Sequence, residues 1–202
     1  MKIYRAVKSN QLNQGFGVNN TYPDTLPVYI ALGHKGHEGW DWAVSCKDYT
    51  VEHGGQCEPI FCDLDIKATI TTIQKSDQFG FGIVARTEDK DGIFEHLWWH
   101  MDSIAPNLSV GSVIESGNML GIAGRTGRAT GDHLHRELRP LGKDTYGNYY
   151  KSQINNGYGG AIDMTPYFEN IFIVDLMTQL EAKVGMLTKL LNLIKQLTGL
   201  KT

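Results

Sequence analysis

Cysteine is scarce in this sequence. The 202 residues contain Cys46, Cys57 and Cys62 and no other cysteine. An odd number with no two-residue-spaced pair predicts neither a disulfide framework nor a cysteine-based zinc knuckle. Reduced thiols are therefore the expectation.

Long hydrophobic runs are also missing. No window reaches the 18 apolar residues that a membrane-spanning helix needs, because charged side chains interrupt even the apolar region 171–200. The amino-terminal segment MKIYRAVKSNQLNQGFG has no apolar stretch of the length that a secretory signal requires. The sequence thus predicts a protein with no transmembrane segment and no visible signal peptide.

An excess of positive charge is absent as well. The formal net charge is −3, which argues against a nucleic-acid partner because such partners require clustered cationic side chains. Hydrophobic residues make up 41% and charged residues 20%, close to the average of globular proteins. The length suits one domain, or one domain with an appendage.

Short strands joined by tight turns are predicted from residue 59 to about residue 140. Apolar and polar residues alternate over 65–70, and the Asp-Lys-Asp-Gly sequence at 89–92 is a hairpin signal. Further along, six glycines follow short apolar runs closely, as in a meander. No helix of ordinary length fits this region, whereas 139–162 has the composition of a long irregular loop.

The last thirty residues differ in pattern. Apolar residues are spaced alternately by four and three, which predicts an amphipathic helix with a coiled-coil-like seam: Ile173, Met177, Leu180, Val184, Leu187, Leu191 and Ile194. Asn170 or Asp175 can cap its start. We expect an all-β domain over 1–168 and a helical appendage over 169–202. Its apolar stripe requires a cover: its own domain, another chain or a membrane surface.

Histidines cluster in two motifs. His133 and His135 lie two residues apart, so on a strand both imidazoles point to the same face. Upstream, His37 and Asp41 in HEGWD add a nitrogen and an oxygen donor. Three such ligands with an open fourth position are typical of a hydrolytic zinc site rather than a structural one. Each motif alone is a weak signal, because solvated or core histidines are common.

Taken in order, these motifs resemble a known family. GHKGHEGWD, HLWWHMDSI, SVGSVIESGNMLGIAGRTG and TGDHLHREL are similar to the motifs of the lysostaphin-like, or LytM-type, zinc endopeptidases, which cut peptide cross-links of bacterial peptidoglycan. The likeness covers residues 12–168. It implies a narrow antiparallel sheet with a groove walled by long loops, and one zinc ion per chain.

The resemblance also assigns roles. It implies that His37, Asp41 and His135 ligate the zinc, and that His100 and His133 are the catalytic histidines, one as general base and the other stabilising the oxyanion or protonating the leaving amine. Which histidine does which stays open. Tyr29 and His34 are weaker candidates for lining the groove, and no function is assigned to His53 and His96.

Three features depart from the family pattern. Asp132 stands where relatives usually carry a proline, and Arg136 stands where an aromatic residue is common. Arg136 alternates away from the metal face, so we expect an altered loop and groove rather than loss of zinc. An insertion at 45–56 follows the first ligand loop, where it can reshape substrate access.

The sequence therefore predicts a zinc metalloendopeptidase that hydrolyses peptidoglycan. A catalytically inactive wall-binding or structural module of the same fold is the main alternative. Zinc carboxypeptidases of the Glu-x-x-His type are disfavoured, because no glutamate is followed three residues later by histidine. Since the substrate lies outside the cytoplasmic membrane, the expected setting is a phage-delivered or otherwise exported wall-lytic enzyme. The helix is the expected site of homo-oligomerisation or of attachment to a larger particle.

Overall fold

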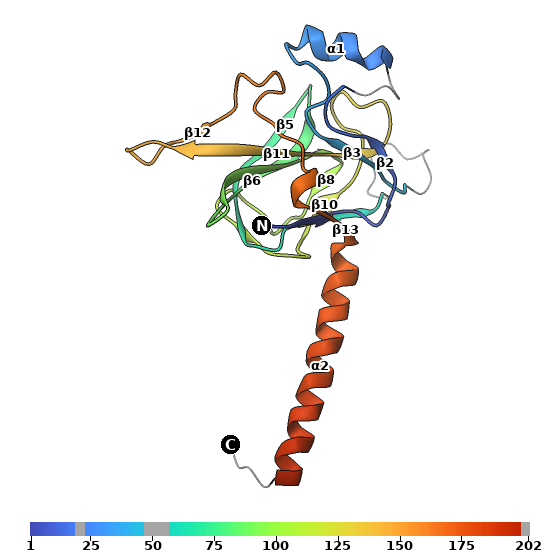
Figure 1. Cartoon of the computed structure of the whole chain (residues 1–202). Coiled ribbons are helices and arrows are strands. Elements are labelled where there is room, and N and C mark those ends of the chain that lie inside the picture. Colours follow the sequence, from blue (N-terminus) through green and yellow to red (C-terminus); the bar gives the residue numbers. More distant parts are fainter. Residues whose placement is uncertain (19–22, 47–56, 199–202) are drawn as a thin grey trace.

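The computed structural model describes residues 1–18, 23–46 and 57–198 (Figure 1). Strands dominate the body, in this order: β1 (Ile3–Arg5), β2 (Leu12–Gln14), β3 (Trp40–Ala43), β4 (Pro59–Phe61), β5 (Ala68–Ser76), β6 (Gly80–Asp89), β7 (Gly92–Met101), β8 (Ser103–Ile104), β9 (Val113–Ile114), β10 (Met119–Ile122), β11 (His133–Lys143), β12 (Tyr149–Lys151) and β13 (Phe168–Phe172). The helices are α1 (Leu26–Ala31) and α2 (Ile173–Thr198), and 3₁₀ turns lie at Pro23–Thr25 and Thr165–Tyr167.

An eight-stranded antiparallel sheet forms the frame of the body. Its strand order is β2-β3-β11-β7-β6-β5-β9, and β12 pairs with β11 off this path. The central strands β5, β6 and β7 are joined by the predicted turns, including the Asp-Lys-Asp-Gly turn between β6 and β7. The described residues between 59 and 140 hold no helix, as predicted.

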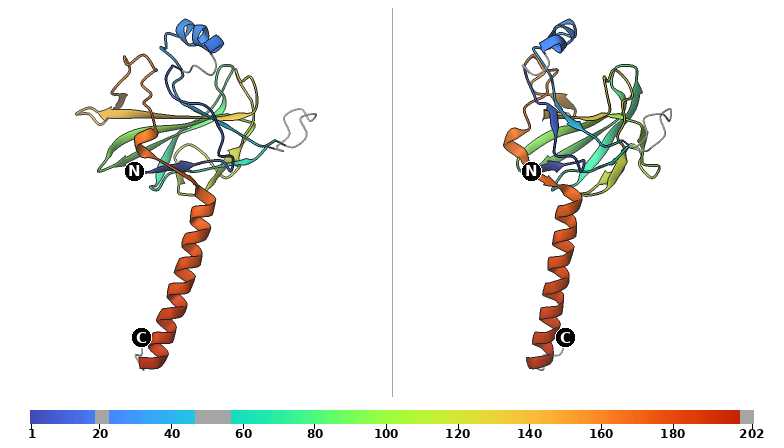
Figure 2. Two further views of the ribbon diagram at one scale, coloured as in Figure 1. Left: turned by 45° about the vertical axis from the view of Figure 1, so that its right-hand side comes forward. Right: turned by 90° about the vertical axis from the view of Figure 1, so that its right-hand side faces the viewer.

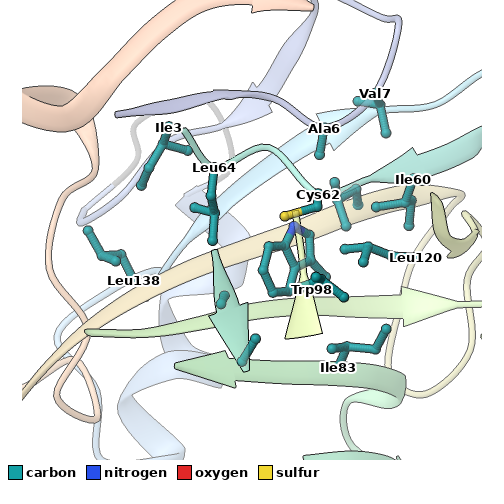
Figure 3. Packing of buried hydrophobic residues seen from close by; sticks show 14 of the residues in the cluster. Ile3, Ala6, Val7, Ile60, Cys62, Leu64, Ile83, Trp98, Leu120 and Leu138 are labelled. Carbon is teal, nitrogen blue, oxygen red and sulfur yellow. The ribbon is translucent and has the colours of Figure 1, made fainter. Parts of the chain in front are cut away.

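The hydrophobic core lies on one face of this sheet. Trp98 from β7 and Ile83 from β6 are buried there in one cluster with Ile60 from β4 and Leu120 from β10 (Figure 3). The latter two strands belong to a three-stranded sheet, β4-β10-β8. Burial of large side chains from both sheets is the main stabilising contribution to such a fold. His133 and His135 of β11 lie on the opposite face of the large sheet.

Two expectations about the carboxy-terminal part need correction. Residues 139–162 are not wholly irregular, because β11 continues to Lys143 and returns as β12, with Leu141 paired to Lys151. The helix begins at Ile173 rather than at residue 169, because Phe168–Phe172 forms β13 and pairs in parallel with β1. Asn170 therefore lies in a strand that pairs with β1, and it does not cap the helix.

The expectation of three reduced thiols is wrong for two of them. Cys46 and Cys57 form a disulfide across an antiparallel bridge between their backbones. Cys62 is free and fully buried in the core, and this burial raises the pKa of its thiol to about 12. The disulfide joins Cys46, in the insertion predicted at 45–56, to Cys57 immediately after it. Residues 47–56, His53 among them, lie outside the described part.

Helix α2 extends away from the β domain (Figures 1 and 2). Ile173 at its start is buried against the body, whereas Val184, Leu187 and Leu191 are between 52% and 65% exposed. The apolar stripe is therefore not covered by its own domain. No helix in the described residues is long and apolar enough to cross a membrane.

Candidate metal centre

Strands β3 and β11 bring the two histidine motifs together. They pair antiparallel with Asp41 opposite His135 and Ala43 opposite His133. Side chains of paired residues lie on the same face of a sheet, so the Asp41 carboxylate meets both imidazoles. His37 reaches the same point from the loop before β3, where its backbone forms a bridge with Gly17.

Three donor atoms converge at this point. His135 Nδ1 lies 2.7 Å from Asp41 Oδ1, and His37 Nε2 lies 3.1 Å from His135 Nδ1. The third side of the triangle, from His37 Nε2 to Asp41 Oδ1, is 3.2 Å. Ligand atoms around a tetrahedral zinc ion are roughly 3.3 Å apart, given Zn–N and Zn–O bonds of about 2.0–2.2 Å. The donor set and its spacing fit zinc.

The remaining ring nitrogens of the two histidines also have partners. His37 Nδ1 lies 3.0 Å from the carbonyl oxygen of Gly15, and His135 Nε2 lies 3.2 Å from Glu137 Oε1. Both partners only accept hydrogen bonds, so both nitrogens carry a proton. The atoms left for a cation are the two that converge on Asp41. Metal-binding histidines in proteins are held by such outer hydrogen bonds.

The pKa values of His135 and Asp41 also favour a positive charge between these two side chains. Burial alone would lower the pKa of His135, but hydrogen bonds to Asp41 and Glu137 overcome this effect and raise the pKa to about 10. Burial would likewise raise the pKa of Asp41, but the hydrogen bonds from His135 and His37 hold it well below its usual value. A cation bound at His135 Nδ1 takes the place of a proton there.

The surroundings of Gly39 explain why the first motif carries a glycine at this position. A β-carbon at this position would lie 2.5 Å from the backbone oxygen of Arg136 and 2.8 Å from His135 Nε2. Any side chain there would push β11 or the His135 ring out of place. The glycine is therefore required by the close approach of the ligand loop to β11.

His100 and His133 lie next to this cluster. Their ring centroids are 4.6 Å apart, and His100 is 5.9 Å from His135 by the same measure. His100 Nδ1 donates to the carbonyl oxygen of Thr126 at 2.8 Å, and His133 Nδ1 donates to that of Gly131 at 2.8 Å. The other ring nitrogen of His133, Nε2, lies 3.7 Å from Asp41 Oδ1. Burial, with the neighbouring His133 and His135, lowers the pKa of His100 to about 4.

An unusual backbone conformation directs His100 towards this site. In the described chain it is the one non-glycine residue with positive φ, at 62°. The pairing of β6 with β7 shifts register just before it, between the Phe81–Met101 and Ile83–Trp98 pairs. Bulges and left-handed residues of this kind re-aim side chains and are frequent at functional sites.

A cleft of about 420 Å³ is lined by all four histidines of this region: His37, His100, His133 and His135. Helix α1 contributes Val28 and Tyr29 to the lining, and the loops after β5 and β10 contribute Phe79 and Arg128. The ring of Tyr29 lies 5.7 Å from that of His37. Burial and the charge of Asp41 raise the pKa of Tyr29 to about 12, so its hydroxyl keeps its proton at neutral pH.

The structure thus brings together His37, Asp41, His100, His133 and His135, the five residues that the resemblance singles out. His34 is half-buried beside Glu38 and does not line the cleft, while His96 lies in the core. Sequence reasoning missed Glu137, although its two-residue spacing from His135 was a usable signal. A second group, Cys46, Cys57 and Asp132, also gathers within 4.8 Å, but the disulfide removes its thiolates.

The antiparallel sheet carries its His/Asp cluster in a cleft, on β3, β11 and the loop before β3. Residues 66–156 match the sequence profile of Peptidase family M23. This is the family that the motifs resemble. The matched segment contains His100, His133 and His135, whereas His37 and Asp41 lie upstream of the match.

Solved structures share the fold. Helicobacter pylori Csd3 is 17% identical with a TM-score of 0.52, over 97% of this chain and 44% of that one. The antimicrobial peptidase lysostaphin from Staphylococcus simulans is 18% identical with a TM-score of 0.51, over 83% and 53% of the chains. A zinc-containing peptidase from Vibrio cholerae is 18% identical with a TM-score of 0.50, over 85% and 41%.

The present chain spans about half or less of each of these three proteins. No curated protein sequence matches it significantly. The comparisons therefore show the fold, and they show a likeness of residues 66–156 to Peptidase family M23.

Proposed function

We propose that this protein is a zinc-dependent metalloendopeptidase that hydrolyses peptide cross-links of bacterial peptidoglycan. The observation that carries the proposal is the convergence of His37 Nε2, Asp41 Oδ1 and His135 Nδ1 beside two further histidines in one cleft. Peptidases of the M23 family are enzymes of this class, and the chain retains a side chain for every role. An inactive wall-binding module would not require all five residues.

The three convergent atoms would hold the zinc ion. Bound there, zinc supplies Lewis-acid chemistry for attack of water on a peptide carbonyl. His37 and His135 contribute neutral nitrogen ligands, and Asp41 contributes the negative charge that favours the cation. Because the outer nitrogens are held by Gly15 and Glu137, the ligand rings do not need to rotate when the ion binds.

His100 and His133 carry the proton transfers. Each is anchored through Nδ1 to a backbone carbonyl group, so Nε2 is the ring atom that would exchange protons with the substrate. One accepts a proton from the attacking water, and the other donates a hydrogen bond to the developing oxyanion or a proton to the leaving amine. Two adjacent imidazoles can serve as base and acid in one turnover.

Tyr29 is placed to bind the substrate. The residue lines the cleft from α1, and its hydroxyl stays protonated at neutral pH. A phenol in this position donates a hydrogen bond to a carbonyl oxygen of the bound peptide, which helps to orient the bond that is cut. In this proposal, the peptide binds in the cleft lined by α1 and by residues 127–130.

The C-terminal helix and the cellular setting complete the proposal. The enzyme acts on the cell wall, delivered by a phage or by export. Helix α2 joins it to a second copy of the chain, because the exposed stripe follows the heptad spacing of a coiled coil.

Digestion of purified sacculi tests the function. Walls with glycine bridges and walls with direct D-alanine–diaminopimelate links are incubated with the zinc-loaded protein, and released fragments are identified by mass spectrometry. We expect fragments with new peptide termini from at least one wall type, and none with His133→Ala. If the zinc-loaded wild type releases nothing from any wall, the proposed activity is wrong.

A further inference from the structure

One face of β11 carries a continuous row of four polar side chains. His133, His135, Glu137 and Arg139 alternate with residues of the opposite face. The first two belong to the candidate site, and the last two extend the row away from it. His135 Nε2 lies 3.2 Å from Glu137 Oε1, and Glu137 Oε2 lies 2.6 Å from an Arg139 guanidinium nitrogen. The row is thus connected from Arg139 to the metal cluster.

We propose that Glu137 is a positioning residue for the metal centre. Its carboxylate accepts the Nε2–H of His135, so that Nδ1 is the atom presented to His37 and Asp41. Arg139 holds the carboxylate in place from the other side. The inference rests on the proposed function for the identity of the ion, but the contact itself belongs to this chain.

Hydrogen-bonding chemistry makes the arrangement directional. A carboxylate without a proton can only accept, so the nitrogen that faces Glu137 must be the one that carries hydrogen. A neutral imidazole has one such nitrogen, and the other then has a free lone pair. For His37, the backbone carbonyl of Gly15 accepts the corresponding hydrogen bond. For His135, the acceptor is the Glu137 side chain, which can be changed by substitution.

Burial separates this role from that of an ordinary surface ion pair. The side chain of Glu137 is fully buried, and that of Arg139 is 13% exposed. A buried carboxylate is costly unless charged partners and hydrogen bonds compensate, and here the compensating groups are Arg139 and the ligand His135. A purely structural ion pair would not require contact with the metal ligand.

The chain also contains a matched control. On the opposite face of β11, Arg136 forms an ion pair with the buried Asp63, at 2.9 Å and 3.1 Å. Like Glu137, Asp63 is a buried carboxylate paired with an arginine of β11, but it does not contact the metal cluster. Loss of charge at Asp63 therefore reports the structural cost alone.

The experiment compares Glu137→Gln with Asp63→Asn in the full-length protein. Zinc Kd is measured by competition with a chromophoric chelator, on protein shown to be folded by circular dichroism. We expect Glu137→Gln to raise the zinc Kd by about 10–100-fold, the usual effect of removing an outer hydrogen-bond partner. Asp63→Asn should lower stability and leave the zinc Kd of the folded protein unchanged. Arg139→Gln, which loosens Glu137 without removing it, should give a smaller rise.

A second measurement reads the contact directly. In protein labelled with ¹⁵N-histidine, long-range ¹H–¹⁵N spectra should show a protonated, slowly exchanging Nε2 for His135, and Glu137→Gln should speed that exchange. An unprotonated Nε2 in the wild type, or an unchanged zinc Kd in Glu137→Gln, overturns this inference alone. A wild type that binds no zinc overturns the proposed function instead.

Discussion

Arg136 and Asp63 form a two-pronged ion pair on the face of β11 opposite the metal cluster. Arg136 Nε lies 2.9 Å from Asp63 Oδ2, and its guanidinium group stacks 4.2 Å above the centre of the Trp98 ring. Arg136 thus points away from the cluster, as the strand alternation predicts, and is buried in the core. Bidentate pairing and stacking stabilise the packing of β11 on the core side of the sheet.

The first prediction concerns metal content. Protein purified without chelators should contain about one zinc ion per chain, as expected for a single three-ligand site. His37→Ala or Asp41→Ala should lose it, because each removes one of the convergent donor atoms. His34→Ala, in the same loop but outside the cleft, is the control and should keep its zinc. Full zinc content in both ligand variants would contradict the assignment.

The second prediction separates proton transfer from metal binding. His100→Ala should keep the zinc ion and lose hydrolytic activity by roughly 10²–10⁴-fold, the usual range for removal of a general acid or base. Cleavage of a wall-derived peptide is followed by chromatography, with zinc measured on the same sample. Near-wild-type turnover by the zinc-loaded variant would show that His100 has no catalytic role.

The third prediction is a pH dependence of stability. Burial, with the nearby charge of Arg136, holds the pKa of the core residue His96 well below its ordinary value. The unfolded chain takes up this proton near pH 6.5 and the folded chain does not. The free energy of unfolding should therefore fall as the pH falls below about 6.5, because the unfolded state then binds more protons.

Urea denaturation at pH 7 and pH 5 measures this effect. His96→Asn keeps an oxygen to accept from Arg136 but removes the titrating ring, so its stability should change less between the two pH values. An equal change in wild type and variant would exclude His96 as the source.

The fourth prediction concerns the disulfide. Cys46 and Cys57 are 11 residues apart, and cross-links of this loop size stabilise proteins by about 2–4 kcal/mol. Replacing both by serine should lower the free energy of unfolding by that amount, and a phosphine reductant should have the same effect on the wild type only. Denatured, unreduced wild type should titrate one thiol, that of Cys62; three thiols would mean that the bond does not form.

The fifth prediction concerns α2. Removing residues 178–202 retains the buried Ile173 but deletes the exposed stripe that starts at Leu180. The truncated protein should stay folded and zinc-loaded, and light scattering should show a shift from oligomer to monomer. Leu187→Glu with Leu191→Glu should act likewise, whereas Lys189→Glu should not. A full-length protein that is monomeric at micromolar concentration would exclude self-association.

Local pattern alone determined a large part of this molecule. The hairpins of β5, β6 and β7 follow from alternation and turn residues, which act within a few positions of the chain. The same alternation put His133 and His135 on one face and Arg136 on the other. These features depend on strand geometry, so they could be predicted without knowledge of neighbouring strands.

Only the tertiary structure decided how distant segments meet. Asp41 and His135 are 94 positions apart, and their contact requires the pairing of β3 with β11. Simple alternation would turn His100 to the same face as Trp98, and only the register shift and positive φ bring it to the cleft. The Cys46–Cys57 bond and the β13 strand before α2 likewise depend on partners brought close by folding. Long-range pairing is set by the packing of the whole sheet, which no local pattern contains.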